Sequence, residues 1–318
     1  MSEKKEDLKL WEWEKCSAGW CAGCGDNGLL YALKEAFVSL SLDPARTLLV
    51  KGIGCSGNDD RVLKCFTFHD LHGQLLLSAT AIKSVNPELT VIASGGDGDG
   101  FAIGMPGFMH TLRRNPDITY IVYDNGVYGL TKGQDSPTGE EQKYPFNPLA
   151  AAISAGCTFV AQGVAQGVVN PTHHLAKIFE MAIRHKGFSF VNVLTACPTY
   201  AHEAQEYNAE MLSFLKHTNT SYDSHSFNAL NDEVDKAVAS AQKKNHTFEI
   251  HEHDVSDDLA AMRRALRQKE KRFIGVFLAR EPKPTFEAME GLDKNSIVLQ
   301  QIFFDDYAHY SKLFDKFF

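Results

Sequence analysis

The segment GGDGDG at residues 95–100 constrains the fold of this chain more than any other feature. It follows an apolar run, LTVIA at 89–93, that is typical of a buried strand. Glycines at the end of a strand let the backbone turn sharply and approach a phosphate closely. A carboxylate cannot bind a diphosphate directly, so Asp97 fits such a site when a divalent metal lies between them. Magnesium is the expected metal, because it takes oxygen ligands and shares them with phosphate oxygens.

A second turn of similar composition, DNGVYG at 124–129, follows the apolar run at 118–123. Asn125 can offer an amide oxygen, and the backbone carbonyl of Val127 can add another hard ligand. Gly, Asp and Asn are also common in ordinary strand-to-helix turns, so either turn by itself is compatible with a purely structural role. A Gly-Asp-Gly turn followed by an Asn-rich turn about one βαβ unit later is more specific than either one.

Four cysteines stand at turns of the predicted fold: Cys21, Cys24, Cys55 and Cys197. The first two form a C-x-x-C pair, and thiolates at this spacing can reach one metal centre from a tight turn. A lone C-x-x-C more often indicates zinc or no metal, and an isolated cysteine is more often a packed thiol than a ligand. Spacing therefore leaves the nature of this centre open.

Apolar strands alternate with amphipathic helices through the first 200 residues, which predicts an α/β fold with a doubly wound, mostly parallel sheet. The predicted strands are 47–50, 89–93, 118–123, 158–160 and 188–194, and the predicted helices are 29–38 (capped by Asp26), 75–84, 102–113, 149–155 and 172–185. Ligands of such sheets bind at the carboxyl ends of the strands. Cys55, Asp97, Asn125 and Cys197 each follow a predicted strand, so we expect them to lie at one edge.

The character of the chain changes after residue 205. We predict a binding domain at 1–205 and a C-terminal extension at 206–318 that packs on that domain or on a partner. Within the extension, the patterns predict a helix at 207–217, a loop at 218–230, a helix at 232–243 and a strand at 273–278.

Composition narrows the possible partners. The 318 residues carry a net charge of −8, and no dense Lys/Arg block indicates nucleic-acid binding. No apolar segment approaches the length of a signal or membrane-spanning helix. We therefore expect a cytoplasmic protein whose seven cysteines are reduced rather than paired in disulfides.

The segment YGLTKGQ at 128–134, together with the two turns, resembles the β subunit of 2-oxoacid:ferredoxin oxidoreductases, particularly the 2-oxoglutarate branch. The resemblance covers roughly residues 19–200. It implies a thiamine diphosphate-binding type of sheet, with Mg²⁺ held by Asp97, Asn125 and Val127. It also implies one 4Fe–4S cluster on Cys21, Cys24, Cys55 and Cys197.

The resemblance further implies which residues meet the cofactor and the substrate. The implied cofactor contacts are Ile53, Gly54, Cys55, Ser56, Gln74, Gly96, Asp97, Gly98, Asp99, Asn125, Val127, Gly129, Leu130 and Thr131. Lys132, Thr131 and His72 are the implied catalytic residues, although Lys132 could also be a solvated loop charge. His69 and His72 could instead form a metal pair if their segment were helical.

Two departures from the family pattern weaken parts of this assignment. Gln74 stands where the family commonly has an arginine beside the diphosphate. Asn58, Asp59 and Asp60 stand where a basic residue often pairs with the distal carboxylate of the substrate, and Arg61 is the nearest cation.

The resemblance implies oxidative decarboxylation of 2-oxoglutarate with coenzyme A to succinyl-CoA and CO2, coupled reversibly to the reduction of ferredoxin. The activating glutamate comes from an α subunit in this family, so we expect this chain to be inactive without its partner and to form an (αβ)2 assembly. Alternatives are an enzyme specific for pyruvate or broad in its 2-oxoacids, a thiamine-dependent carboligase without redox chemistry, and a non-catalytic iron–sulfur electron-transfer subunit.

Overall fold

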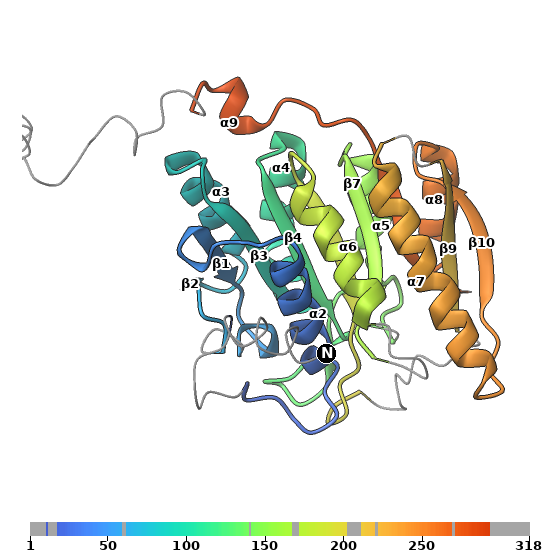
Figure 1. Ribbon diagram of the computed structural model, residues 1–318. Helices are drawn as coiled ribbons and strands as arrows, with labels where there is room; N and C mark the ends of the chain where they lie inside the picture. The colour runs from blue at the N-terminus through green and yellow to red at the C-terminus, as the bar shows by residue number, and fades with distance from the viewer. Residues whose placement is uncertain are drawn as a thin grey trace, which may run out of the picture.

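The computed structural model describes residues 11, 18–58, 62–139, 141–166, 172–201, 211–219, 222–268 and 271–292. Within this part of the chain, nine strands form one sheet in the order β10-β9-β11-β7-β8-β4-β3-β1-β2 (Figure 1). The strands are β1 Thr47–Lys51, β2 Phe66–His69, β3 Thr90–Gly96, β4 Ile118–Asp124, β7 Phe159–Val164, β8 Ser189–Leu194, β9 Leu212–Asn219, β10 Glu249–Asp254 and β11 Arg272–Ala279. All neighbouring pairs are parallel except β11 with β7. The mostly parallel α/β prediction is confirmed.

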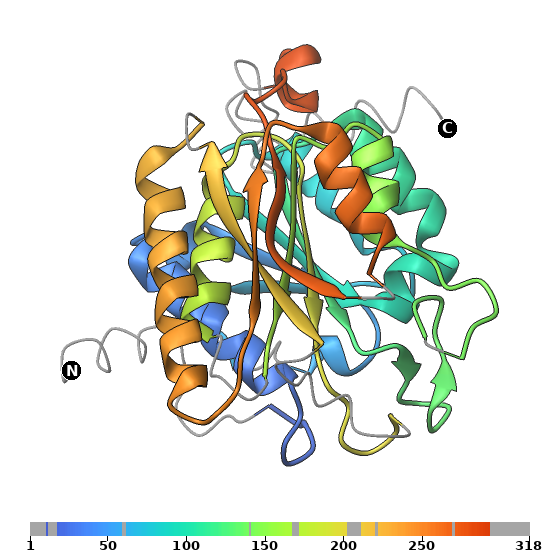
Figure 2. The ribbon, with the colours of Figure 1, turned by 90° about the vertical axis from the view of Figure 1, so that its right-hand side faces the viewer.

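Helices cover both faces of this sheet (Figures 1 and 2). Their bounds are α2 Asp26–Ser39, α3 Leu75–Val85, α4 Met105–Arg114, α5 Pro148–Ser154, α6 Thr172–Arg184, α7 Ser224–Gln242, α8 Asp258–Leu266 and the short α9 Phe286–Met289. Apolar side chains of α2, α6 and α7 belong to one core cluster, and those of α3, α4, α5 and α8 to another. Each face of the sheet therefore has its own core.

The central strands are buried on both faces. All seven residues of β4 are buried, and their side chains alternate between the two clusters, as Ile121 and Val122 illustrate. A strand that is buried on both sides needs apolar residues at nearly every position. This requirement explains why β3, β4 and β8 were recognisable as continuous apolar runs.

Several predicted elements begin or end differently. Asp26 is the first residue of α2 rather than its cap, and Gly25 precedes it without a side-chain capping bond. The helix predicted at 102–113 divides into a π-helical turn, Asp99–Ile103, and α4, where Pro106 occupies the first turn. Proline suits that position because the backbone N–H groups of the first turn have no partner within the helix.

The predictions for the C-terminal extension were partly wrong. Residues 212–217 form strand β9 rather than a helix, because this segment pairs with β10 on one side and β11 on the other. Residues 224–230 begin α7 rather than a loop, and the Asp223 side chain caps this helix by accepting a hydrogen bond from the Ser226 amide. Strands β2 and β10 were not predicted. The aromatic tail at 297–318 lies outside the described residues.

The turns of interest follow strands that point the same way. β1, β3, β4 and β8 are parallel neighbours, so their carboxyl ends meet at one edge of the sheet, the lower edge in Figure 1. Ligand sites of open α/β sheets lie at this edge. None of the described helices is long and apolar enough to cross a membrane.

Candidate cofactor site

A small cavity of about 50 Å³ lies at the carboxyl edge, where five segments of the chain meet. Its lining comprises Asp26, Ile53, Gly54, Cys55, Ser56, His72, Gly96, Asp97, Gly98, Asp99, Tyr123, Asn125, Val127, Tyr128 and Gly129. The structure thus brings together most of the residues that were predicted to contact a cofactor. The cavity is well below the roughly 300–1,000 Å³ of a complete small-molecule site, so it can enclose only part of a cofactor.

Asp97 is a buried acid of this cavity, and a second acid, Asp124, lies close to it. Asp97 is 2% exposed, and its Oδ2 accepts hydrogen bonds from the Ser136 hydroxyl and from Thr138 Oγ1, the latter at 2.7 Å. Thr138 Oγ1 also lies 2.7 Å from Asp124 Oδ1. Burial, followed by the negative charge of Asp124, raises the pKa of Asp97 to about 7, while the hydroxyls oppose this rise. A bound cation would relieve both unfavourable effects.

Asp99 holds three turns together. Its Oδ1 accepts from the backbone amides of Gly73 at 2.8 Å and Ile53 at 3.2 Å, and it lies 2.6 Å from His72 Nδ1. A Cβ at Gly52 would collide with the Asp99 carboxylate, so glycine is required there. Asp99 therefore positions the Ile53 turn and the His72 side chain at the cavity.

Asn125 closes its own turn. Its side-chain Oδ1 accepts from the Val127 amide at 3.1 Å, and Gly126 between them has a φ of +72°. A carbonyl oxygen has two lone pairs, so Asn125 retains the capacity to bind a cation. Nearby, the Tyr128 ring packs so closely on Gly98 that a Cβ at Gly98 would collide with it.

Leu130, Thr131 and Lys132 occupy the tip of a hairpin rather than the cavity. The hairpin is built from β5 (Val127–Tyr128) and β6 (Gln134–Asp135), and Lys132 adopts a left-handed φ of +64° at its tip. Leu130 is 96% exposed. The structure therefore does not bring these predicted contacts together with the Asp97 turn.

The remaining predicted positions differ in their surroundings. His72 lines the cavity, whereas Gln74 is half-buried immediately before α3 and is not among the lining residues. His69 lies in strand β2 rather than in a helix, with its ring against Gly57. The proposed charge substitute, Arg61, and its neighbours Asp59 and Asp60 lie outside the described residues.

The cysteine segments are tied to one another through the backbone. The Cys24 amide donates to the Cys21 carbonyl at 3.1 Å, and the next amide, of Gly25, donates to Ala196 O at 3.1 Å, beside Cys197. Trp20 Nε1 donates to the Cys55 carbonyl at 2.6 Å. All three cysteine-bearing segments therefore meet at the carboxyl edge.

The thiols affect one another electrostatically. Burial raises the pKa of Cys24 to about 12, and the negative charge of Asp26 adds to the rise. Burial also raises the pKa of Cys55, followed by the charges of Asp26, Cys197 and Cys21. Within the described residues, however, no three His, Cys, Asp or Glu side chains are arranged closely enough to hold a single metal ion.

Sequence reasoning missed the residues that surround Asp97. Ser136 and Thr138 belong to the segment DSPT at 135–138, which lies beyond the hairpin tip. The sequence shows two hydroxyls beside an acid, but nothing in their spacing shows that the hairpin folds back onto the Asp97 turn. Asp26 was interpreted as a helix cap and instead lines the cavity.

Comparisons with known proteins relate this chain to thiamine-dependent enzymes. Residues 52–193 match the family model of the thiamine pyrophosphate enzymes' C-terminal TPP-binding domain. The chain is 47% identical over 194 residues to a 2-oxoacid:ferredoxin oxidoreductase subunit beta from Saccharolobus solfataricus, covering 57% of this chain and 62% of that protein. It is 34% identical over 222 residues to the 2-oxoglutarate synthase subunit KorB from Methanocaldococcus jannaschii, covering 66% and 81%.

A solved structure is similar over nearly the whole chain. It is a 2-oxoglutarate:ferredoxin oxidoreductase from Magnetococcus marinus with 2-oxoglutarate, coenzyme A and succinyl-CoA bound, at 29% identity and a TM-score of 0.74. The match covers 96% of this chain and 95% of that one. By contrast, the chain spans about three fifths, 62%, of the length of the Saccharolobus relative.

Proposed function

Because this chain belongs to the family of 2-oxoacid:ferredoxin oxidoreductase β subunits, we propose that it carries the cofactors of a 2-oxoglutarate:ferredoxin oxidoreductase. The enzyme would convert 2-oxoglutarate and coenzyme A to succinyl-CoA and CO2 while it reduces ferredoxin, reversibly. The observation that carries the proposal is the convergence of the Asp97 turn, the Asn125 turn and the Cys55 turn on one cavity. No carboligase without redox chemistry needs that third turn.

Asp97, Asn125 and the Val127 carbonyl would hold Mg²⁺ against the diphosphate. The fit rests on Asp97, a buried carboxylate that lies beside a second acid, Asp124. Among the described contacts, no cation balances the charge of these two acids. Thiamine diphosphate supplies the carbanion chemistry of decarboxylation when it is bound. The chain's own part is to orient the diphosphate through the glycine turns and to keep His72 at the cavity through its contact with Asp99.

Cys21, Cys24, Cys55 and Cys197 would hold a 4Fe–4S cluster. The support is the network of backbone contacts that joins their segments, together with the raised pKa values of Cys24 and Cys55, to each of which the charge of Cys197 contributes. A cluster can bind thiolates separated more widely than the ligands of a single ion, because four iron atoms share them. Cys55 also lines the small cavity, so one proposed cluster ligand and the proposed thiamine diphosphate contacts share a wall.

The exposed hairpin tip would form the substrate side of the site. Thr131 and Lys132 would contact the substrate carboxylate, and Leu130 would lie over the cofactor ring, once an α subunit covers them. The 96% exposure of Leu130 supports this role, because a large apolar side chain in solvent is typical of an interaction surface. We propose that α also supplies the activating glutamate, that the assembly is (αβ)2, and that it works in the cytoplasm.

The test is anaerobic viologen reduction by this chain co-expressed with its α partner. 2-Oxoglutarate, pyruvate and a branched-chain 2-oxoacid are compared, each with and without coenzyme A. We expect the highest kcat/KM with 2-oxoglutarate and dependence on coenzyme A. A preference for pyruvate, or equal use of all three, would contradict the substrate assignment. No reduction with any of the three 2-oxoacids, in a complex that contains iron but no thiamine diphosphate, would instead indicate an electron-transfer subunit.

A further inference from the structure

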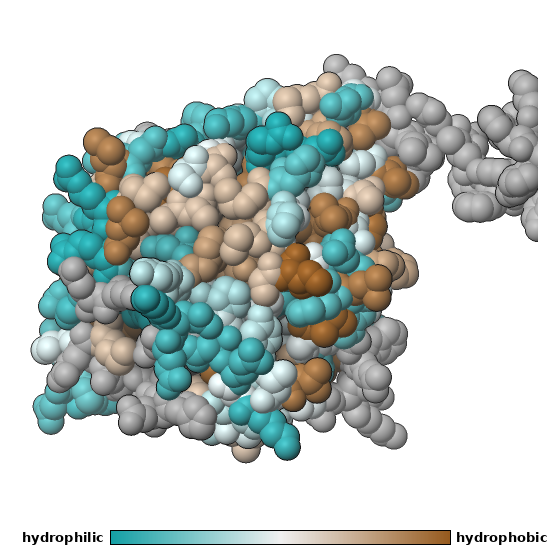
Figure 3. All heavy atoms as spheres, turned by 180° about the vertical axis from the view of Figure 1, so that it is seen from behind, coloured by the Kyte–Doolittle hydropathy of each residue, from teal (hydrophilic) through white to brown (hydrophobic). Residues whose placement is uncertain are grey.

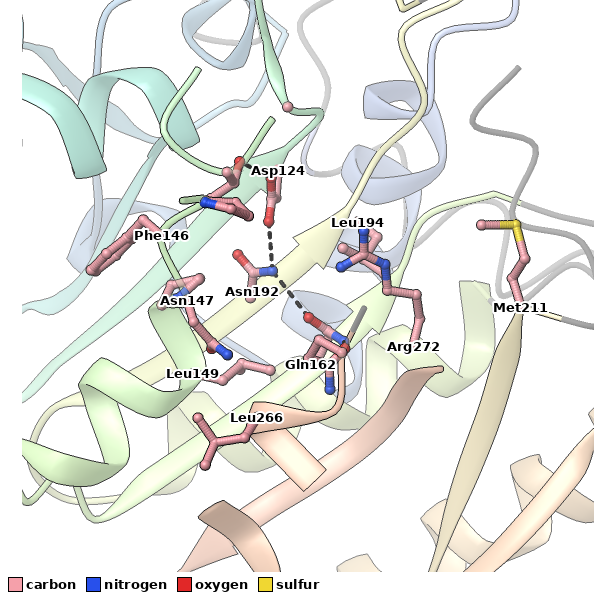
Figure 4. A pocket seen from close by; sticks show the side chains of 15 residues that line it. Asp124, Phe146, Asn147, Leu149, Gln162, Asn192, Leu194, Met211, Leu266 and Arg272 are labelled. Atoms are coloured by element: carbon pink, nitrogen blue, oxygen red, sulfur yellow. Dashed lines mark hydrogen bonds between the residues drawn. The ribbon is translucent and has the colours of Figure 1, made fainter. Parts of the chain in front are cut away.

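A second and larger cavity, of about 450 Å³, lies beside Asp124 (Figure 4). Its size falls within the roughly 300–1,000 Å³ range of small-molecule sites. Apolar walls come from segments that are distant in sequence, including Phe146, Leu149, Leu194 and Leu266. None of the proposed cofactor contacts lines this cavity, and most of them line the smaller one. The residues proposed to hold thiamine diphosphate and Mg²⁺ therefore leave this space unused.

The deepest polar group in this cavity is the carboxamide of Asn192, which is 2% exposed. Its Nδ2 donates to Asp124 Oδ2 at 2.9 Å and to Gln162 Oε1 at 3.1 Å, and these two acceptors fix which end is nitrogen. Among the described residues, its Oδ1 has no hydrogen-bond partner. Figure 4 shows this oxygen turned away from Asp124 and Gln162, on the side of Phe146.

Buried carbonyl oxygens in folded proteins nearly always accept a hydrogen bond. The amide nitrogens near Asn192 are already committed, because Gln162 Nε2 donates to Gln268 Oε1 at 2.7 Å and to Phe273 O at 2.9 Å. A ligand that satisfies Asn192 must therefore bring its own N–H or O–H donor. Asp124, whose carboxylate lies next to Asn192, favours a nitrogen donor over a hydroxyl because nitrogen groups more readily carry positive charge.

A positively charged side chain, Arg272, lies at a more exposed position of the cavity than the Asp124 carboxylate. Arg272, the first residue of β11, is half-buried and lines the same cavity. Guanidinium groups bind carboxylates and phosphates through paired hydrogen bonds. We propose that this cavity binds a small molecule with a nitrogen donor for Asn192 and Asp124, an anionic group for Arg272, and an apolar or aromatic body between them. Apolar α-amino acids and adenine nucleotides share this chemistry.

The proposed site is connected to the cofactor site by a chain of hydrogen bonds. Asn192 donates to Asp124, and Thr138 Oγ1 bridges the two acids, at 2.7 Å from both Asp124 Oδ1 and Asp97 Oδ2. A ligand that draws Asn192 toward itself weakens the Asn192–Asp124 hydrogen bond. The hydrogen bonding of Thr138 with Asp124 and Asp97 changes as a result. Occupancy of the cavity is thus expected to change thiamine diphosphate affinity, and the effect must be reciprocal.

Calorimetric titration of the full chain with L-phenylalanine and, separately, with adenosine 5′-monophosphate tests the proposal. The titrations are made without thiamine diphosphate, so the result does not depend on the proposed reaction. We expect one probe to bind with a Kd below about 1 mM, an affinity of roughly 4 kcal/mol. The probe that binds identifies the source of the ligand chemistry.

Three variants locate the binding. Arg272→Gln is expected to weaken the affinity at least tenfold, and Leu266→Trp, which places an indole at the cavity wall, to abolish it. Arg263→Gln changes an exposed arginine of α8 that does not line the cavity, and it should leave the affinity unchanged. Circular dichroism checks that each variant is folded. Binding of neither probe, or equal binding by all variants, would overturn the site.

The link to Asp97 has its own readout. With the binding probe at saturation, the Kd of Mg²⁺–thiamine diphosphate is expected to shift at least threefold, and Thr138→Val is expected to remove that shift. A Kd that does not move with the probe would overturn the connection between the two cavities.

Discussion

Two parts of the segment 95–138 differ in burial: the Asp97 turn, called here the prepared end, and the hairpin tip at 130–132, called here the exposed end. At one end, Asp97 is 2% exposed and held by two hydroxyls from this same chain. At the other, the hairpin tip places Leu130 in solvent at 96% exposure. On the function proposed above, the chain prepares its diphosphate and metal contacts in advance, and another subunit would complete the substrate side.

Loss of the Asp97 carboxylate should have the largest effect on cofactor affinity. Asp97→Asn takes away the only carboxylate among the three proposed magnesium ligands, so we expect Mg²⁺-dependent thiamine diphosphate affinity to fall by more than about 100-fold, since even outer-shell partners are worth 10–100-fold. Activity of the co-expressed complex should fall with it. Thiamine retained after gel filtration measures the loss. Asp232→Asn, at an exposed acid of α7, is the control and should retain the cofactor.

Cys55→Ser should separate electron transfer from cofactor binding. We expect the co-expressed complex to lose iron and ferredoxin reduction, because a serine hydroxyl is a poor substitute for a thiolate ligand. Thiamine diphosphate should stay bound, since Asp97 and Asn125 are unchanged. Iron analysis and thiamine content are measured on the same sample. Cys65→Ser, outside the predicted quartet, should behave as wild type, and a variant of Cys55 with full iron content would exclude it as a ligand.

Loss of a hydroxyl that contacts Asp97 should lower Mg²⁺ affinity less than loss of the Asp97 carboxylate. Thr138→Val removes the group shared between Asp97 and Asp124, and we expect Mg²⁺ affinity to fall by about 10–100-fold, as for other outer-shell partners of metal sites. Thr138→Ser restores a hydroxyl at the same place and should recover most of the affinity. Equal losses in both variants would indicate a packing defect instead.

A substitution at the hairpin tip should lower turnover of the complex and leave cofactor affinity unchanged. Lys132→Ala is expected to lower kcat/KM for 2-oxoglutarate in the complex by about tenfold, the value of one hydrogen bond to a charged group. Thiamine diphosphate affinity of the isolated chain should not change, because Lys132 does not line the cavity. Lys243→Ala, at an exposed lysine after α7, is the control. A loss of cofactor affinity in Lys132→Ala would contradict the division between the two ends.

The raised pKa of Asp97 also predicts a pH dependence of stability. Because the pKa of Asp97 is raised from 3.8 to about 7 in the fold, the folded chain binds more protons than the unfolded chain between these values. Stability from this group is therefore present at low pH and is lost as pH rises toward 7. Thermal melts without metal should show this trend, and Asp97→Asn should flatten it. Added Mg²⁺ and thiamine diphosphate should restore stability most strongly above pH 7.

Sequence patterns predicted the central sheet well and its far edge poorly. β3, β4 and β8 are buried on both faces, so their apolar runs were unmistakable. β9, with Lys216 and His217 in its sequence, was interpreted as helix. Its strand form depends on pairing with β10 and β11, and such tertiary contacts leave little trace in a local pattern.

The candidate site shows the same contrast. Asp97, Asn125 and Cys55 were predictable because glycine turns after strands leave a local signal. Ser136 and Thr138 were not, since their contact with Asp97 depends on how a hairpin folds back over some forty residues. The role of Asp124, which joins two cavities, likewise depends on side-chain positions from separate strands.

The most direct test of this account is titration of the purified chain, without α, with thiamine diphosphate in the presence and absence of Mg²⁺. Thiamine without its diphosphate serves as the control ligand, and 2-oxoglutarate turnover is measured on the same sample. The account predicts Mg²⁺-dependent binding of thiamine diphosphate, weak or no binding of thiamine, and no turnover. Failure to bind thiamine diphosphate with Mg²⁺, or substantial turnover without α, would contradict it.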